Sequence, residues 1–491
     1  MQRKFLTNLG LLPTLNLLIK PCWIFAIDRN VQIITGVDYG IYFEILNFSF
    51  LFNILLDLGI TNFNNRNIAQ NRQLLNKHFS AIIVLKSLLA LSYSLIAFFV
   101  AVFVMKYEGS QLILLAWLLL NQILLSFILY LRSNISGLLM FKTDSFLSVL
   151  DRLLMIFFCA ILLWGHLTEM KFRIEWFVYS QTAAYLFTAT VAAIIVMKKA
   201  GFRKFNFNWP FFLMIMKRSL PFALLVLLMT FYNRLDPVML GKMLPGKIGD
   251  RQVGIYASGF RLLDAANMIA YLFAVLLVPV FSRMIKNKES VEKMVRLSFT
   301  LLITVAVIVA VGAIFYSYEI MDLLYREHIH ESAGVFRLLM GGFIAVSTTY
   351  IFGTLLTANG NLRALNLISL TGLIINFLMN LILIPHLFAT GSAYASLTTQ
   401  FFIAIAEVIM VQRVFRFRVN YRFLMTLLFF IGGVIIFNFL STLIPPISFS
   451  ILSPGRSWLS GFALAILASI GWATLLRLLS IRSLMQILRE E

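Results

Sequence analysis

Long apolar segments recur along the whole chain, separated by short polar connections. A helix needs about 20 mostly apolar residues to cross the hydrocarbon core of a bilayer. This template predicts about fourteen spanning helices, at 9–34, 40–62, 79–105, 112–135, 145–165, 175–197, 212–240, 253–281, 294–317, 334–357, 362–385, 391–412, 422–443 and 458–479. The pattern therefore predicts an all-α polytopic membrane protein.

Composition strengthens this prediction, because 60% of the residues are hydrophobic and only 13% are charged. The largest connections on the predicted outer side, near 241–252 and 318–333, are too short to fold as domains. An enzyme with a large extramembrane catalytic domain is thereby excluded, whereas an enzyme with a site inside the membrane is not.

The basic residues indicate the orientation of the helices. Lys and Arg gather in connections such as "NNRNIAQNRQLLNKH", "SRMIKNKESVEKMVR" and "QRVFRFRVNYR". Cytoplasmic connections are enriched in these residues, and about fourteen helices place every strongly basic connection on one side. We therefore expect cytoplasmic N and C termini. The net charge of +20 then reflects the orientation of the helices in the membrane and does not indicate nucleic acid binding.

A short internal echo suggests two lobes. The predicted second helix opens with "DYGIYFEILN" and the predicted eighth with "QVGIYASGFR", each after a charged cluster. Repeats in the same orientation fit two parallel six-helix lobes, a common transporter plan. The expected lobes are residues 1–205 and 206–420, followed by a helix pair and a cytoplasmic tail at 421–491.

Charged residues inside predicted helices are the main candidates for function, because a charge in the bilayer centre costs about 2.5–3.5 kcal/mol. Lys20, Arg234 and Arg261 form the deep basic set. They line a hydrated cavity between the lobes or form ion pairs between helices, and a net cationic interior favours an anionic cargo. Pro237 predicts a kink beside Asp236.

Other helix charges lie nearer to the predicted boundaries, where snorkelling or local pairing explains them: Glu44, Lys86, Asp151, Arg152 and Arg337.

The acidic residues best placed to carry a proton or a sodium ion are Asp57, Asp264 and Glu407. Each is equally well explained as an ion-pair partner. The membrane potential itself supplies about 2.3 kcal/mol per charge per 100 mV, so the coupling ion stays open.

Catalytic and metal motifs are weak or missing from the sequence. His328 and His330 lie two apart in "REHIHES", which a solvated loop explains better than a metal site. The chain has no P-loop, no Gly-x-Ser-x-Gly and no His-Glu-x-x-His pattern. We therefore expect no cofactor, no metal and no enzymatic activity.

Three segments are informative together: "GVDYGIYFEILNFSFLFNILLDLGITNFNNRNIAQ", "LPFALLVLLMTFYNRLDPVMLG" with "VGIYASGFRLLD", and "TANGNLRALNLISLTGLIINFLMNLILIPHLFATGSAYASLTTQ". They resemble the polysaccharide repeat-unit flippases (Wzx type) of the multidrug/oligosaccharidyl-lipid/polysaccharide exporter (MOP) superfamily. The segment "IPHLFATG" is longer than the turn usual in the family.

This resemblance implies a flippase of the bacterial cytoplasmic membrane. Its substrate would be an undecaprenyl-pyrophosphate-linked oligosaccharide, moved by alternating access through a cationic central cavity. Arg suits such a substrate because its guanidinium binds phosphate oxygens with several donors. By position, the implied substrate contacts are Arg66, Arg234 and Arg261, with Lys20 as a further candidate.

Three alternatives stay open: a flippase for lipid-linked peptidoglycan precursor, a multidrug cation antiporter, and a membrane-embedded polysaccharide polymerase or acyltransferase. The basic interior counts against the antiporter. The short outer connections count against the enzyme. Expected partners are the lipid-linked oligosaccharide, membrane lipids and other polysaccharide-assembly proteins, with no nucleic acid.

Overall fold

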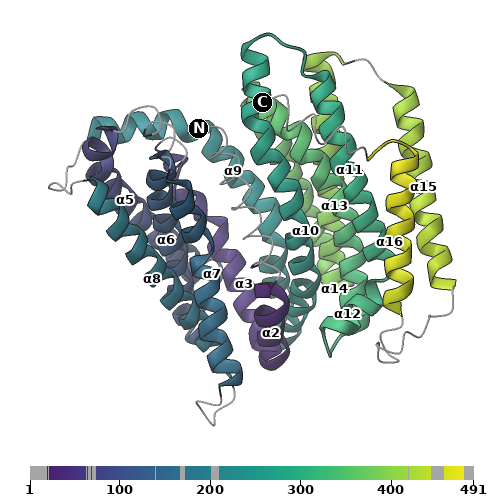
Figure 1. Cartoon of the computed structure of the whole chain (residues 1–491). Coiled ribbons are helices and arrows are strands. Elements are labelled where there is room, and N and C mark those ends of the chain that lie inside the picture. Colours follow the sequence, from purple (N-terminus) through teal and green to yellow (C-terminus); the bar gives the residue numbers. More distant parts are fainter. Residues whose placement is uncertain are drawn as a thin grey trace. The chain divides into compact units, whose positions relative to one another are not determined.

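A computed structural model of the chain describes residues 22–61, 73–138, 140–165, 172–200, 209–417, 420–443 and 458–479, together with positions 19, 64 and 68. Within these ranges the chain is helical and contains no strand (Figure 1). Contacts divide it into two units, Met1–Gly254 (unit 1) and Ile255–Glu491 (unit 2). The lobe boundaries at 205/206 and 420/421 stay predictions.

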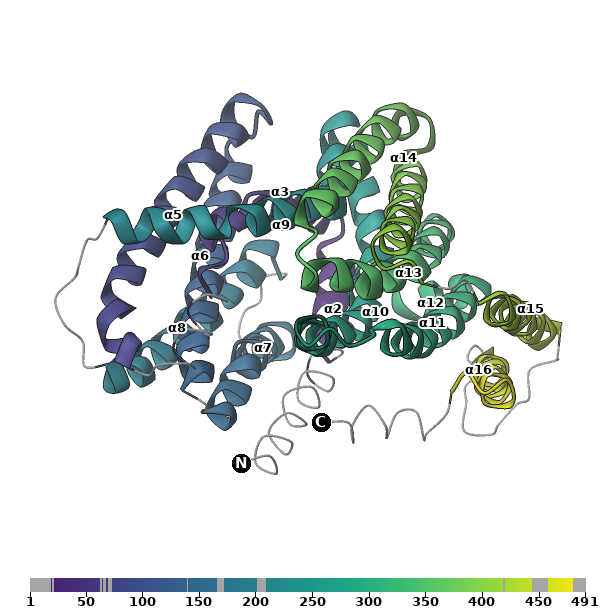
Figure 2. The same cartoon turned by 90° about the horizontal axis from the view of Figure 1, so that it is seen from above.

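Unit 1 is a bundle whose helices pack both on the next helix of the chain and on more distant ones. In this unit α6 packs against α8 and α3, α3 packs against α9, and α7 packs against α8 (Figure 2). Buried Leu, Ile and Phe side chains of α5, α6 and α7 pack with Ala192, Val196 and Ala200 of α8 in its core. Its elements are η1 (Trp23–Asp28), α2 (Arg29–Thr35), α3 (Val37–Leu51), η2 (Asn53–Leu56), α5 (Gln73–Phe103), α6 (Ser110–Gly137), α7 (Phe141–Trp164), α8 (Ile174–Ala200), α9 (Trp209–Met243) and the start of α10 (Gly246–Lys286).

Unit 2 contains the rest of α10 and six further helices within its described part. In this unit α13 packs against both α11 and α14, and α15 pairs with α16. The helices are α11 (Glu292–Phe315), α12 (Ser317–Leu324), α13 (Ile329–Ala358), α14 (Leu362–Phe415), α15 (Tyr421–Leu443) and α16 (Trp458–Leu475).

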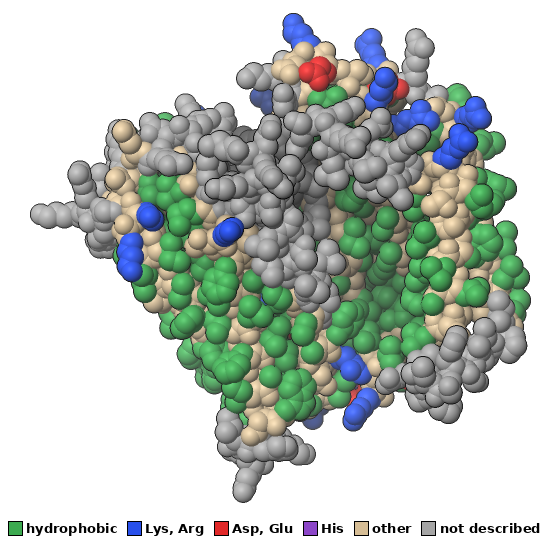
Figure 3. All heavy atoms as spheres, in the orientation of Figure 1, with side chains coloured by type: hydrophobic (Ala, Val, Ile, Leu, Met, Phe, Trp, Pro, Cys, Tyr) green, Lys and Arg blue, Asp and Glu red, His purple; other side chains and the backbone are tan. Residues whose placement is uncertain are grey.

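Large apolar side chains cover the outer flanks of both units. On α5 they recur every four residues, at Leu91, Leu95, Phe99 and Phe103, so they form one stripe, and each is 59–67% exposed. Figure 3 shows hydrophobic side chains along the visible helix flanks and Lys or Arg mostly towards the helix ends. Ten helices in the described ranges are long and apolar enough to cross a membrane. The chain is therefore a multi-pass, all-α membrane protein, as predicted.

Helix α14 accounts for two of the predicted spans. Its two arms meet at Phe388, whose backbone is not helical (φ 52°, ψ −134°). A Cβ at Gly391 would lie 2.6 Å from the carbonyl oxygen of Leu383, so this close approach of the arms requires glycine. The hairpin predicted between 362–385 and 391–412 is thus present.

The predicted span 40–62 is wrong at its second half, because α3 ends at Leu51. The chain then forms the short helix η2 and turns through Leu58 and Gly59, both of which have positive φ. Side chains of other helices, Lys86 and Ser126, bind the Leu56 carbonyl released by this break.

The predicted outer connection at 241–252 is also wrong, because α10 begins at Gly246, directly after α9 ends at Met243. Helix α9 continues through Pro237. Another predicted connection, 318–333, contains the short helix α12.

Candidate functional site

Helices α3 and α9 of unit 1 lie antiparallel and share a polar face. Gly40, Glu44 and Asn47 follow one another at helical spacings of four and three, so they occupy one face of α3. Asp250 of α10 lies beside Gly40, Gly241 of α9 lies beside Glu44, and Arg234 of α9 lies beside Asn47. The alignment of these three pairs places one end of the face beside the start of α10 and the other at Arg234.

Two glycines allow the helices of this face to approach closely. A Cβ at Gly40 would overlap the backbone carbonyl of Asp250, and a Cβ at Gly241 would overlap the carboxylate of Glu44. Such contacts exclude any larger residue unless the neighbour moves. Small residues are the usual means by which membrane helices approach each other.

The carboxylate of Glu44 is enclosed at this contact, with 1% of the residue exposed. The hydroxyl of Tyr107 donates a hydrogen bond of 2.7 Å to Glu44 Oε1. The ammonium of Lys242 lies 3.9 Å from the same oxygen and 3.9 Å from the centre of the Tyr107 ring. A buried carboxylate therefore has both a hydrogen-bond donor and a cation as partners.

The groups around Glu44 include two whose titration is shifted. Burial raises the pKa of Tyr107 well above its usual value, and the nearby Glu44 carboxylate raises it further. The phenol thus remains protonated and remains a donor. Burial also raises the pKa of Asp250; Lys242 opposes this shift and Asp38 adds to it.

Arg234 is the half-buried cation at the other end of the face. Its Nη1 donates to Asn47 Oδ1 at 3.4 Å, and its guanidinium lies 5.2 Å from the centre of the Phe50 ring. The Asn47 amide is fixed with its oxygen towards Arg234, because its Nδ2 donates to the carbonyl of Phe43 at 2.7 Å. The neighbouring Asp236 is fully buried. Position 234 thus presents a guanidinium held from α3 by Asn47 and Phe50.

A second charged cluster lies where η2 ends, between Asp57 and Lys86 of α5. Lys86, 1% exposed, donates to the Leu56 carbonyl at 3.0 Å and pairs with Asp57 Oδ1 at 2.9 Å. Ser126 also donates to the Leu56 carbonyl, and Asp57 accepts hydrogen bonds from the backbone and hydroxyl of Thr61. These bonds satisfy the backbone where the helix breaks. Of the two roles open to Asp57, the structure shows the ion-pair partner.

In unit 2, Arg261 and Asp264 lie one turn apart on α10, and both are half-buried. Glu407 lies on the second arm of α14, is 4% exposed and contacts Gly353 of α13. The predicted contacts Lys20 and Arg66 lie outside the described residues.

The charges near the predicted boundaries pair locally, as expected. Arg337 Nε donates to Ser317 Oγ at 2.5 Å. Arg152 lies 3.9 Å from Asp151 and 5.8 Å from the centre of the Trp23 ring.

The histidine pair of the outer connection does not gather metal ligands. His328 lies 3.9 Å from Glu331, and the ring of His330 packs against Tyr318. Within the described ranges, no group of three or more His, Cys, Asp or Glu side chains could hold a metal ion.

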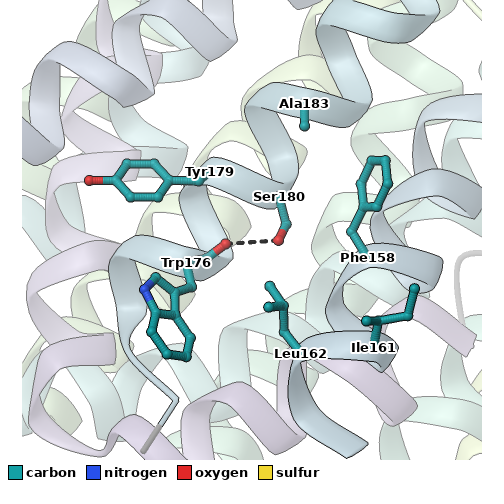
Figure 4. Close-up of a pocket in the computed structure, with 7 residues that line it drawn as sticks. All are labelled: Phe158, Ile161, Leu162, Trp176, Tyr179, Ser180 and Ala183. Atoms are coloured by element: carbon teal, nitrogen blue, oxygen red, sulfur yellow. Dashed lines mark hydrogen bonds between the residues drawn. The ribbon is translucent and has the colours of Figure 1, made fainter. Parts of the chain in front are cut away.

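An apolar pocket of about 410 Å³ lies between α7 and α8 in unit 1 (Figure 4). Its lining residues are Phe158, Ile161, Leu162, Trp176, Tyr179, Ser180 and Ala183. Among the lining residues, Ser180 has the one aliphatic hydroxyl, and this hydroxyl donates to the Trp176 carbonyl at 2.8 Å. The pocket suits hydrocarbon and has no cation for a phosphate.

Sequence reasoning missed Tyr107 and Lys242 as partners of Glu44. Tyr107 is 63 residues away from Glu44 in the chain, so no local pattern joins them. The available signal was Glu44 itself, since a carboxylate in an apolar helix requires partners elsewhere.

Comparisons with known proteins agree with this fold. The structure is similar to the lipid II flippase MurJ in an inward closed conformation, with a TM-score of 0.71, 13% identity and coverage of 95% of this chain and 98% of that chain. It is also similar to an inward-facing multidrug resistance MATE family transporter of the MOP superfamily, with a TM-score of 0.60, 13% identity and coverage of 82% and 94%.

A third similar structure is a MOP superfamily transporter from Pyrococcus furiosus, with a TM-score of 0.53, 13% identity and coverage of 83% and 93%. At these identities the likeness shows the fold, which is that of MOP superfamily transporters. No curated protein sequence matches the chain significantly.

The sequence itself matches a family model. Residues 30–285, more than half of the chain, match the model described as polysaccharide biosynthesis protein. This match includes α3, α9 and the polar face between them, and it confirms the resemblance seen in the sequence. The chain belongs to the polysaccharide biosynthesis protein family.

Proposed function

We propose that the protein is a flippase that moves an undecaprenyl-pyrophosphate-linked oligosaccharide repeat unit across the bacterial cytoplasmic membrane. The family membership and the multi-pass fold support transport in polysaccharide assembly. The observation that most supports an anionic substrate is the half-buried guanidinium of Arg234 on a membrane helix.

The chemistry of Arg234 fits a pyrophosphate. A charge within a membrane helix is costly and generally marks a substrate or ion pathway. The guanidinium stays ionised and offers several donors, so it can replace part of the water that a pyrophosphate loses. Because Asn47 and Phe50 fix its position from α3, it is oriented before a substrate arrives.

Within this proposal, Arg261, Arg66 and Lys20 are further candidate contacts, and two lobes rearrange to expose the site to each side in turn. The polyprenyl chain stays in contact with lipid and with the apolar helix flanks. Other polysaccharide-assembly proteins would supply and consume the cargo.

A flippase for lipid-linked peptidoglycan precursor is the second candidate, because the fold is similar to that of the lipid II flippase MurJ. Both cargoes place a pyrophosphate between a polyprenol and a sugar, so Arg234 serves either. A multidrug cation antiporter fits less well, since Arg234 repels a cationic drug.

Polysaccharide export tests the proposal. A bacterium that lacks its own repeat-unit flippase would receive this gene together with its native sugar-assembly genes. We expect the wild type to restore surface polymer, Arg234→Lys to restore part of it and Arg234→Ala to restore at least tenfold less. The matched control is Arg173→Ala, which removes an arginine whose side chain is 60% exposed and should leave export unchanged.

All variants need confirmed membrane levels. Full export by a well-inserted Arg234→Ala variant would contradict the assignment of Arg234 as a substrate contact. No export by the well-inserted wild type would favour the peptidoglycan-precursor function, which rescue of a strain depleted of its lipid II flippase would check.

A further inference from the structure

The second arm of α14 in unit 2 encloses the carboxyl group of Glu407. The residue is 4% exposed, and it faces α13 at Gly353. A Cβ at Gly353 would lie 2.9 Å and 3.0 Å from the two carboxyl oxygens, so the glycine leaves the space that the carboxyl group fills. Thr349 precedes Gly353 by one helical turn and presents its hydroxyl on the same face.

This carboxyl group has no counter-charge among the described residues. Its polar neighbours are the Thr349 hydroxyl and the Gly353 backbone, and no charged side chain takes part in its surroundings. Glu407 Oε2 and Thr349 Oγ1 are both buried and both lack a hydrogen-bond partner in the described structure. The site therefore has an oxygen acceptor and a hydroxyl side by side.

An ionised carboxylate in such a place would be very costly, because neither water nor a cation compensates its charge. The neutral acid removes this cost, and its own O–H can donate a hydrogen bond. Thr349 Oγ1 can accept that hydrogen. The packing of α13 on α14 thus fits a protonated Glu407.

We propose that Glu407 is a proton-binding site, occupied while α13 and α14 enclose it. When the two helices separate enough for water to enter, the O–H bond breaks, the proton passes to water and the carboxylate becomes hydrated. Return of a proton from water restores the neutral acid and permits the helices to close. The role of this exchange in driving transport rests on the flippase function proposed above; the protonation itself does not.

The site is poorly suited to a metal cation. Sodium and similar ions need several oxygen ligands, and the carboxyl group is the only acidic group described there. A proton needs only the carboxylate and one acceptor, which Glu407 and Thr349 supply.

Infrared spectroscopy of the full-length protein in lipid nanodiscs tests the proposal. The difference spectrum between the wild type and Glu407→Gln at about pH 7 should contain the C=O stretch of one protonated carboxylic acid. Glutamine keeps the size of the side chain, and monodisperse elution would show that the variant folds. The matched control is Glu331→Gln, whose side chain is 44% exposed in the wild type and should give no acid band.

Two results would overturn the proposal: a Glu407→Gln difference spectrum without an acid band, and an acid band that sodium chloride abolishes but choline chloride does not. The spectrum requires no transport. If the acid band is present and the protein exports no polysaccharide, the proton site stands and the proposed function falls. If export is normal and the acid band is missing, the proposed function stands and the proton site falls.

Discussion

Each unit of the molecule buries a glutamate against a glycine of another helix, but the two sites are built differently. In unit 1, Glu44 packs on Gly241, accepts a hydrogen bond from Tyr107 and lies 3.9 Å from Lys242. In unit 2, Glu407 packs on Gly353, with the Thr349 hydroxyl as its neighbouring side-chain polar group.

The comparison shows that burial alone does not define the role of a membrane carboxylate. Glu44 has partners on two other segments, so it fixes α3 to α9 and to the connection that contains Tyr107. Glu407 lacks such partners among the described residues, so its surroundings favour a neutral acid that can exchange a proton. The partnered carboxylate stabilises the fold, and we infer that the unpartnered one is available for function.

Replacing each glutamate with methionine should give the largest difference between the sites. Glu44→Met leaves the Tyr107 hydroxyl and Lys242 without their acceptor, and we expect a loss of about 2–3 kcal/mol in the free energy of unfolding. Glu407→Met removes a carboxyl group without a charged partner, so its effect should stay within about 1 kcal/mol of zero. Thermal unfolding of the detergent-solubilised variants would measure both; equal losses would contradict the distinction.

The two glycines should give a smaller difference in the same direction. Gly241→Ala places a methyl group into a carboxylate that Tyr107 and Lys242 hold in place, which should cost about 2 kcal/mol. Gly353→Ala meets the unanchored carboxyl group of Glu407, which can shift, so about 1 kcal/mol is expected. The same unfolding experiment applies, with Gly254→Ala as a control because a Cβ added there would meet nothing within 4 Å. A greater loss at Gly353 than at Gly241 would show that Glu407 is the more firmly anchored group.

The hydroxyl groups should give the smallest difference. Tyr107→Phe removes a hydrogen bond to a charged group and should lower the stability by about 1.5 kcal/mol. Thr349→Val removes the acceptor proposed for the O–H of Glu407, which is a bond between two uncharged groups, so a smaller loss of about 1 kcal/mol is expected. Unfolding midpoints measured side by side would decide this pair, and a greater loss in Thr349→Val than in Tyr107→Phe would contradict the ranking.

Much of the fold follows from the sequence, because spanning helices are determined by local hydropathy. The hairpin of α14 was predictable from Pro385 and the small residues around Gly391. An ion pair was also one of the two roles predicted for Asp57, and Lys86 forms it. The break of α3 after Leu51 was not predicted, because apolar residues continue beyond it and the bonds from Lys86 and Ser126 come from distant helices.

The candidate site was predictable only in part. Arg234 is recognisable as a charge within an apolar helix, but its orientation by Asn47 depends on the antiparallel packing of α3 on α9. Likewise, the sequence identifies Glu407 as a possible ion carrier without showing that it differs from Asp57. Only the three-dimensional partners separate the two, since Asp57 is paired with Lys86.

Translocation in a defined bilayer tests the flippase account most directly. Proteoliposomes would contain the full-length protein and lipid-linked oligosaccharide from the native sugar-assembly system, and a membrane-impermeant glycosidase would report the sugar exposed outside. The account predicts that the wild type makes the protected inner pool accessible, that Arg234→Ala slows this at least tenfold and that Arg173→Ala does not. A wild type no faster than protein-free liposomes, or an Arg234→Ala variant as fast as the wild type, would contradict it.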